Sequence, residues 1–170
     1  VSHFGLPAAK VHHVPLGIET ADALPRTEPL PTPFMIGYLA RICPAKGLMN
    51  LCRAFAKLRD EGRNCRLRFA GYLGESDRAY LQSVQDYLLG QGCANAYEYL
   101  GEISRERKFQ MLSELHAFSV PTDYAEAKGL FVLEALAAGV PVVLPDHGSF
   151  PELVRATGGG LLFQQGSVDG

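Results

Sequence analysis

From residue 34 onward, short apolar runs of strand length alternate with segments of helical periodicity. The expected strands are 34–40, 66–71, 97–101, 117–121, 140–145 and 158–163. The expected helices are 48–58, 76–89, 104–115 and 129–139. Strands that alternate with helices form parallel sheets covered on both faces. The pattern therefore predicts an α/β fold with a doubly wound, mostly parallel sheet, whose ligands lie outside the carboxyl ends of the strands.

Composition narrows the function classes. The chain has 170 residues, of which 47% are hydrophobic, enough for one domain with its own core. A formal net charge of −2 provides no basic excess for a nucleic-acid partner. We find neither an apolar stretch of membrane-spanning length nor a signal peptide at the start.

The four cysteines are spread along the chain without a C-x-x-C pair, at Cys43, Cys52, Cys65 and Cys93. This spacing predicts buried or half-buried thiols in a reducing compartment rather than a zinc site. We therefore expect a cytoplasmic protein without a zinc site. We also expect no other metal and no cofactor.

Glu134 stands out because the expected helix around it is apolar on every side. Such a helix is normally buried, and a buried glutamate needs a partner. All its neighbours three and four residues away are apolar, so no local cation can pair with it. A pair of ligand hydroxyls would suit an ionised carboxylate, which only accepts hydrogen bonds. An ion pair with a distant arginine, or a place at the helix edge, remains an alternative.

Glu126 lies eight residues earlier, and the start of the helix lies between the two glutamates. The free N–H groups near Gly129 and Leu130 at such a helix end attract phosphate. Two hydroxyl-binding carboxylates on either side of an anion site match a sugar–diphosphate–ribose ligand.

Two cations follow the first expected strand, Arg41 at its end and Lys46 in the turn before the next helix. Both positions are at the carboxyl edge of the expected sheet. There they could hold a diphosphate, the arginine through its forked guanidinium and the lysine as a point charge.

These segments resemble the retaining, nucleotide-sugar-dependent glycosyltransferases of the GT-B fold, family 4 or group 1, and specifically their C-terminal, nucleotide-sugar-binding, Rossmann-like domain. The likeness covers nearly the whole chain and is most specific in the middle block. Its blocks are VSHFGLPAAKVHHVPLGIE at the start, ARICPAKGLMNLCRAFAKL (40–58), the long block 99–143 with its two glutamates, and HGSFPELV with GGGLLF (147–163).

The resemblance implies a role for each matching position. Arg41, Lys46 and Glu126 would be catalytic, the two cations stabilising the leaving diphosphate and Glu126 holding hydroxyls of the donor sugar. Glu134 would bind the ribose. The backbone at Glu102 and Ile103 would lie by the base, and that at Gly129 and Leu130 would contact sugar and phosphate. Stereochemical retention and independence of metals also come from the resemblance.

One departure bears on the donor site. Lys128 stands where the family often has an aromatic or small residue, and its charge would strengthen anion binding or alter the choice of sugar.

The resemblance also divides the chain into residues 1–33, an interdomain connection with a proline-rich lead-in, and residues 34–170, a nucleotide-sugar-binding domain shortened at its C-terminus. The N-terminal acceptor domain would be absent, and the fragment alone inactive. Acceptor binding and any peripheral membrane association would depend on that domain.

The sequence leaves two other classes of function to consider. A non-catalytic nucleotide-binding or regulatory α/β domain would keep the same pocket and stays open. A dehydrogenase or ATPase is disfavoured because the chain has neither G-x-G-x-x-G nor G-x-x-x-x-G-K-[ST].

Overall fold

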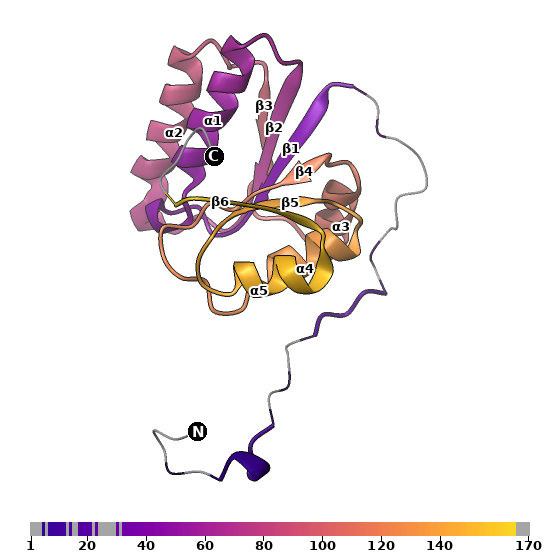
Figure 1. Ribbon diagram of the computed structural model, residues 1–170. Helices are drawn as coiled ribbons and strands as arrows, with labels where there is room; N and C mark the ends of the chain where they lie inside the picture. Colours follow the sequence, from indigo (N-terminus) through magenta and orange to yellow (C-terminus); the bar gives the residue numbers. More distant parts are fainter. Residues whose placement is uncertain are drawn as a thin grey trace.

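The computed structural model describes residues 5, 7–12, 14, 17–21, 23, 30 and 32–165. Most of the proline-rich stretch over residues 25–33, predicted as an extended connection, lies outside these residues. Ahead of the domain, a short 3-10 helix, η2 (Ala8–Lys10), is drawn well apart from the sheet (Figure 1).

Within the described residues, six parallel strands form one sheet in the order β3-β2-β1-β4-β5-β6. The strands are β1 (Phe34–Leu39), β2 (Cys65–Ala70), β3 (Tyr97–Tyr99), β4 (Ala117–Phe118), β5 (Val142–Pro145) and β6 (Gly160–Phe163). The order reverses between β1 and β4, and the carboxyl ends of the strands at such a reversal open into a crevice. The predicted parallel α/β fold is confirmed.

Helices cover both faces of the sheet (Figure 1). They are α1 (Leu48–Asp60), α2 (Arg78–Gly90), α3 (Arg105–Ser113), α4 (Leu130–Ala137) and α5 (Phe150–Thr157). Short 3-10 turns η3 (Pro44–Lys46) and η4 (Glu75–Asp77) precede α1 and α2. The pair α1 and α2 lies beside β1, β2 and β3, whereas α3, α4 and α5 lie on the other side along β4, β5 and β6.

Large side chains from both layers fill the core. Six aromatic residues of the described part of the chain are fully buried: Tyr38, Phe55, Phe69, Phe109, Phe118 and Phe150. Burying an aliphatic or phenylalanine side chain of this kind stabilises a fold by about 1.5–3 kcal/mol. All four cysteines are free and buried, as predicted, and burial raises the pKa of Cys52 to about 12.

Helix α5 was not predicted from the sequence. It has eight residues, which is shorter than the window over which helical periodicity can be judged. Its signals are at its ends: Pro151 lies in the first turn, and Gly158 closes the helix in a left-handed conformation. A proline just inside and a glycine just past the end would have revealed it.

Several predicted elements are shorter in the structure. The strand expected over 117–121 pairs only at Ala117 and Phe118, since the chain then leaves the sheet towards Pro121, which has no N–H to donate. The strand expected over 97–101 ends at Tyr99. The helix expected from Ser76 begins at Arg78, and the Asp77 side chain at its start makes no capping hydrogen bond.

Candidate functional site: a cleft at the carboxyl edge of the sheet

Lys46 is placed by a tight turn between β1 and α1. The turn η3 ends at Gly47, whose φ of 74° is left-handed. A Cβ there would lie 1.7 Å from the carbonyl oxygen of Pro121. Glycine therefore lets the segment after β1 pack directly against the segment after β4. This close approach brings Lys46 to the point where the strand order reverses.

Glu126 comes to the same point from the other side, in the segment between β4 and α4. Its carbonyl accepts a hydrogen bond from the Ser149 N–H at 2.8 Å, which anchors its backbone at the start of α5. Its Oε2 accepts a hydrogen bond from Lys46 Nζ at 2.7 Å, and both side chains are only 14% exposed. The other oxygen, Oε1, lies 3.4 Å from the backbone N–H of Lys128.

The electrostatics favour the ionised form of both partners. Burial alone would raise the pKa of Glu126, but hydrogen bonds from Lys46 and from the N–H groups of Lys128 and Gly129 leave that pKa below its ordinary value. Burial would lower the pKa of Lys46, yet hydrogen bonds to Glu126 and Tyr124 leave it above its ordinary value. The pair is therefore a carboxylate and an ammonium at neutral pH.

Two aromatic rings complete the surroundings of Lys46. Its Nζ lies 4.8 Å from the ring centre of Tyr124 and 5.4 Å from that of Phe131, which is in the first turn of α4. Rings at these distances attract a cation. Phe131 also lines the cleft described next, so it joins the two halves of the site.

Glu134 has a partner that the sequence analysis did not foresee. Lys108 Nζ of α3 lies 2.5 Å from Glu134 Oε1, and the two side chains are 19% and 17% exposed. The expectation that α4 is buried on all sides is wrong, since only Val132 and Ala135 of this helix are buried and Leu130 is 38% exposed. The reason is that one side of α4 faces an opening.

That opening is a cleft of about 360 Å³ at the carboxyl edge. It is bounded by the ends of β1 and β2, by the segment before α3, and by α3 and α4 themselves. Its lining includes Leu39, Gly71, Tyr72, Glu102, Ile103, Ser104, Arg105, Lys108, Phe131 and Glu134. Three residues singled out from the sequence, Glu102, Ile103 and Glu134, therefore meet in one cavity.

The remaining predicted residues lie around this cleft with differing contacts. The Arg41 side chain is exposed, and its Nε donates a hydrogen bond to Cys43 Sγ at 3.4 Å, so the structure does not bring it into the Lys46–Glu126 pair. Lys128 is exposed just before α4. Gly129 is buried and begins α4 with a left-handed φ of 60°.

Sequence reasoning missed the lysine and the aromatic groups of the site. Lys108 lies one turn after Ser104, whose hydroxyl caps α3. The sequence signal for it was a cation in the first turns of a helix that starts at the carboxyl edge of the sheet. Tyr72, which is 56% exposed, lies two residues after the end of β2. An aromatic residue at that position was a second signal.

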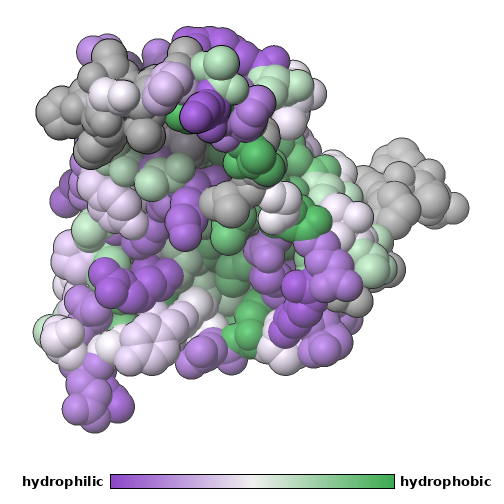
Figure 2. Space-filling view, turned by 90° about the horizontal axis from the view of Figure 1, so that it is seen from below, coloured by the Kyte–Doolittle hydropathy of each residue, from purple (hydrophilic) through white to green (hydrophobic). Residues whose placement is uncertain are grey.

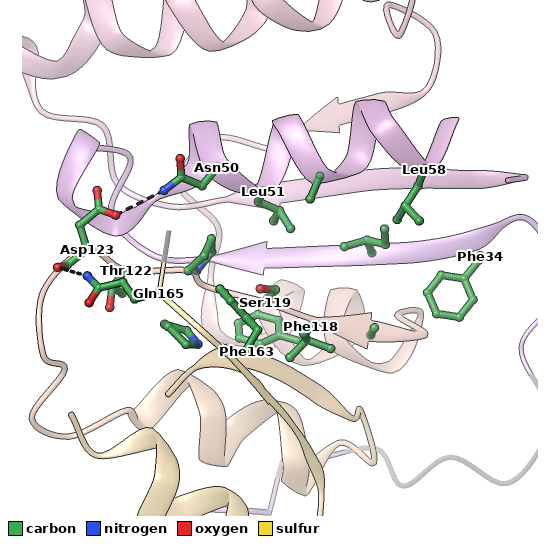
Figure 3. Close-up of a pocket in the computed structure, with 16 residues that line it drawn as sticks. Phe34, Asn50, Leu51, Leu58, Phe118, Ser119, Thr122, Asp123, Phe163 and Gln165 are labelled. Atoms are coloured by element: carbon green, nitrogen blue, oxygen red, sulfur yellow. Dashed lines mark hydrogen bonds between the residues drawn. The ribbon is translucent and has the colours of Figure 1, made fainter. Parts of the chain in front are cut away.

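A second groove, which is mainly apolar, runs along α1 and the sheet (Figure 3). It runs from Phe34 and Leu58 at one end to Asp123 and Gln165 at the other. Asp123 accepts hydrogen bonds from Asn50 at 3.3 Å and, through its carbonyl, from Gln165 at 2.7 Å. No ion pair among the described residues lines it, so we place the functional site at the carboxyl edge instead.

Apolar surface is also gathered rather than scattered on the face seen from below. Figure 2 shows hydrophobic residues collected in a strip across the middle of this face, with hydrophilic residues along its margins.

None of the helices in the described part of the chain has the length and hydrophobicity that a membrane crossing requires.

The fold and site define an α/β domain with a charged cleft at the reversal point of a parallel sheet. The family model for glycosyl transferases group 1 matches residues 22–170. The chain therefore belongs to the group 1 glycosyl transferase family, as its resemblance implied.

Curated relatives carry glycosyltransferase names. Over 164 residues, 93% of this chain, it is 29% identical to the putative colanic acid biosynthesis glycosyltransferase WcaL of Escherichia coli (strain K12). In an alignment of 184 positions that covers 99% of this chain, it is 29% identical to a GDP-mannose-dependent alpha-(1-6)-phosphatidylinositol monomannoside mannosyltransferase of Mycobacterium tuberculosis (strain ATCC 25618 / H37Rv). The chain spans 39% and 46% of the length of these relatives, less than half of each.

Solved structures agree on the fold. The C-terminal domain of a glycosyl transferase group 1 family protein (LpcC) from Francisella tularensis superposes with a TM-score of 0.78 at 19% identity, covering 89% of this chain and 82% of that one. Anabaena Alr3699/HepE, solved in complex with UDP and glucose, gives a TM-score of 0.70 at 23% identity, covering 79% of this chain and 35% of that one.

Proposed function

We propose that this chain is the donor-binding domain of a glycosyltransferase that moves a sugar from a nucleoside-diphosphate sugar to an acceptor with retention. The observation that carries the proposal is the meeting of Lys46 and Glu126 at the start of α4, with Glu134 eight residues along in an adjoining cleft. The donor is a sugar, a diphosphate and a ribose in that order. Glu126, then Lys46 with the helix N-terminus, and then Glu134 match these parts in the same order.

Each part of the donor has a complementary group. The ribose hydroxyls would donate to Glu134, whose carboxylate Lys108 holds in the cleft. The base would lie against the backbone of Glu102 and Ile103 and the exposed ring of Tyr72. The diphosphate would reach the N–H groups that begin α4 and the Lys46 ammonium.

Catalysis would consist of stabilising the leaving diphosphate. As the sugar–oxygen bond breaks, negative charge grows on the diphosphate, and fixed positive groups lower the energy of that transition state. Lys46, Arg41 and the start of α4 would supply this charge, and Lys128 would add a cation at the sugar end. We propose that these groups make a metal ion unnecessary.

Relatives support a nucleotide-sugar donor without fixing its identity. One relative is named as GDP-mannose-dependent, whereas Anabaena Alr3699/HepE was solved with UDP-glucose. We propose that residues 1–33 connect this domain to an N-terminal domain that binds the acceptor, and that any membrane association belongs to that domain. Cytoplasmic location remains part of this proposal.

Parallel calorimetric titrations of the chain with UDP, GDP, ADP and pyrophosphate test the proposal. We expect at least one nucleoside diphosphate to bind, and Arg41→Ala and Lys46→Ala each to weaken it. Glu134→Gln should weaken the nucleoside diphosphate by about tenfold and leave pyrophosphate within about twofold, because only the former carries a ribose. EDTA should change neither affinity.

The control is Glu98→Gln, which removes a carboxylate that pairs with Arg68 away from the cleft. It should leave all affinities unchanged. If Glu134→Gln weakened pyrophosphate as much as the nucleoside diphosphate, the ribose role would be wrong.

A further inference from the structure

In the structure, the Glu126 carboxylate occupies the place where the donor diphosphate is proposed to bind. One oxygen accepts from the Lys46 ammonium at 2.7 Å, and the other faces the N–H of Lys128 at 3.4 Å. The Gly129 N–H also contributes to lowering the pKa of this carboxylate. An ammonium and the N–H groups at a helix start are the donors that a phosphate oxygen uses.

The pair is too enclosed to be an incidental surface contact. Both side chains are 14% exposed, and the rings of Tyr124 and Phe131 lie against the ammonium. The Tyr124 hydroxyl lies 3.5 Å from the same carboxylate oxygen that binds Lys46. An arriving diphosphate therefore meets donors that already hold an anion.

We propose that Glu126 is an internal stand-in for the donor diphosphate, which displaces its carboxylate from Lys46 and from the start of α4. This inference rests on the proposed function and deepens it. Once displaced, the carboxylate is free to accept hydrogen bonds from the hydroxyls of the attached sugar. A ligand with a diphosphate but no sugar displaces Glu126 without giving it a new partner.

If Glu126 is a stand-in, Glu126→Gln should change two affinities in opposite directions. In Glu126→Gln, no carboxylate competes for Lys46, so ligands with a bare diphosphate bind more tightly. The same variant has a weaker acceptor for the sugar hydroxyls, so a sugar nucleotide loses affinity relative to its own nucleoside diphosphate. A residue that only positioned Lys46 would weaken both kinds of ligand when substituted.

The test is calorimetry on the chain with pyrophosphate, UDP, GDP, UDP-glucose and GDP-mannose. We expect Glu126→Gln and Glu126→Ala to bind pyrophosphate about fivefold more tightly than the unsubstituted chain. The ratio of sugar-nucleotide affinity to nucleoside-diphosphate affinity should fall in both variants. Thermal unfolding of each variant shows that it is folded at the titration temperature.

Two further variants separate competition from a general loss of negative charge. Asp123→Asn removes a carboxylate from the same region. The Asp123 N–H donates to the carbonyl of Ala45, the residue before Lys46, but the Asp123 side chain bonds Asn50 and not Lys46. It should leave pyrophosphate affinity within about twofold, since a charge not bonded to Lys46 is largely screened. In a Lys46→Met background, Glu126→Gln should lose most of its gain.

The outcomes distinguish the inference from the function on which it rests. If neither Glu126 variant binds pyrophosphate more tightly than the unsubstituted chain and Asp123→Asn do, the stand-in proposal is overturned. Tighter pyrophosphate binding with no affinity for any nucleotide supports the stand-in and overturns the nucleotide-sugar proposal. A chain that binds none of the five ligands overturns both.

Discussion

Lys46 and Glu126 each favour the charged form of the other. Burial acts against the ionised form of each residue, and their mutual hydrogen bond outweighs it. A half-buried pair of this kind contributes more when intact than either member does alone, because removing one partner leaves a poorly solvated charge. A second ion pair, Lys108–Glu134, joins α3 and α4.

The Lys46–Glu126 pair predicts a pH-dependent contribution to stability. The pKa of Glu126 is lower in the folded chain than the value of about 4.3 expected when it is unfolded. Its stabilisation is therefore complete above that unfolded value and is lost as the pH falls through the lower, folded value. Glu126→Gln should lower the free energy of unfolding by about 1 kcal/mol at pH 7 and by much less near pH 3.

Urea unfolding of both chains from pH 3 to pH 7 measures this difference. Glu98→Gln, which alters an exposed ion pair, serves as the control. A difference between the chains that does not change with pH would show that the pair adds no proton-linked stability.

At the scale of elements, the site depends on short segments that leave the carboxyl edge. The turn η3 and the start of α4 approach each other because Gly47 allows contact between the segments that follow β1 and β4. Helix α3 adds the lysine that holds Glu134, and α5 anchors the backbone of Glu126. No single helix or strand contains the site.

Gly47→Ala should therefore be strongly destabilising. A left-handed φ costs a residue with a side chain about 1–2 kcal/mol, and the new Cβ would collide with a backbone oxygen that cannot turn away. We expect a loss of about 3 kcal/mol or more in the free energy of unfolding, measured by urea denaturation. The matched control is Gly62→Ala, also left-handed at φ 80° but with nothing within 4 Å, which should lose only the conformational part. Equal losses would show that the close packing is unimportant.

The sequence predicted the elements better than their contacts. Periodicity located every strand of the sheet and every helix except α5, because each presents a run of apolar residues to the core. Glu134 was recognised as needing a partner from outside its helix, but Lys108 is 26 residues away and no local pattern links the two. The hydrogen bond from Arg41 to Cys43 was equally hidden, since the direction of a side chain in a turn depends on how the turn packs.

At the scale of the whole molecule, two cavities are candidates for the donor-binding site. The apolar groove along α1 presents mainly carbon atoms (Figure 3). The lining of the cleft beside α3 and α4 includes the charged residues Glu102, Arg105, Lys108 and Glu134. A polyanionic ligand requires the second set. Because the chain spans less than half the length of the curated relatives described above, turnover is expected only with an acceptor-binding partner domain.

The most direct test is to map bound nucleoside diphosphate by backbone amide chemical shifts, titrating the labelled chain with UDP and GDP. We expect the largest shifts in residues 41–47, 102–108 and 126–134, around the Lys46–Glu126 and Lys108–Glu134 pairs. Shifts concentrated along the groove at Phe34, Leu58 and Phe163, with those three segments unchanged, would contradict it.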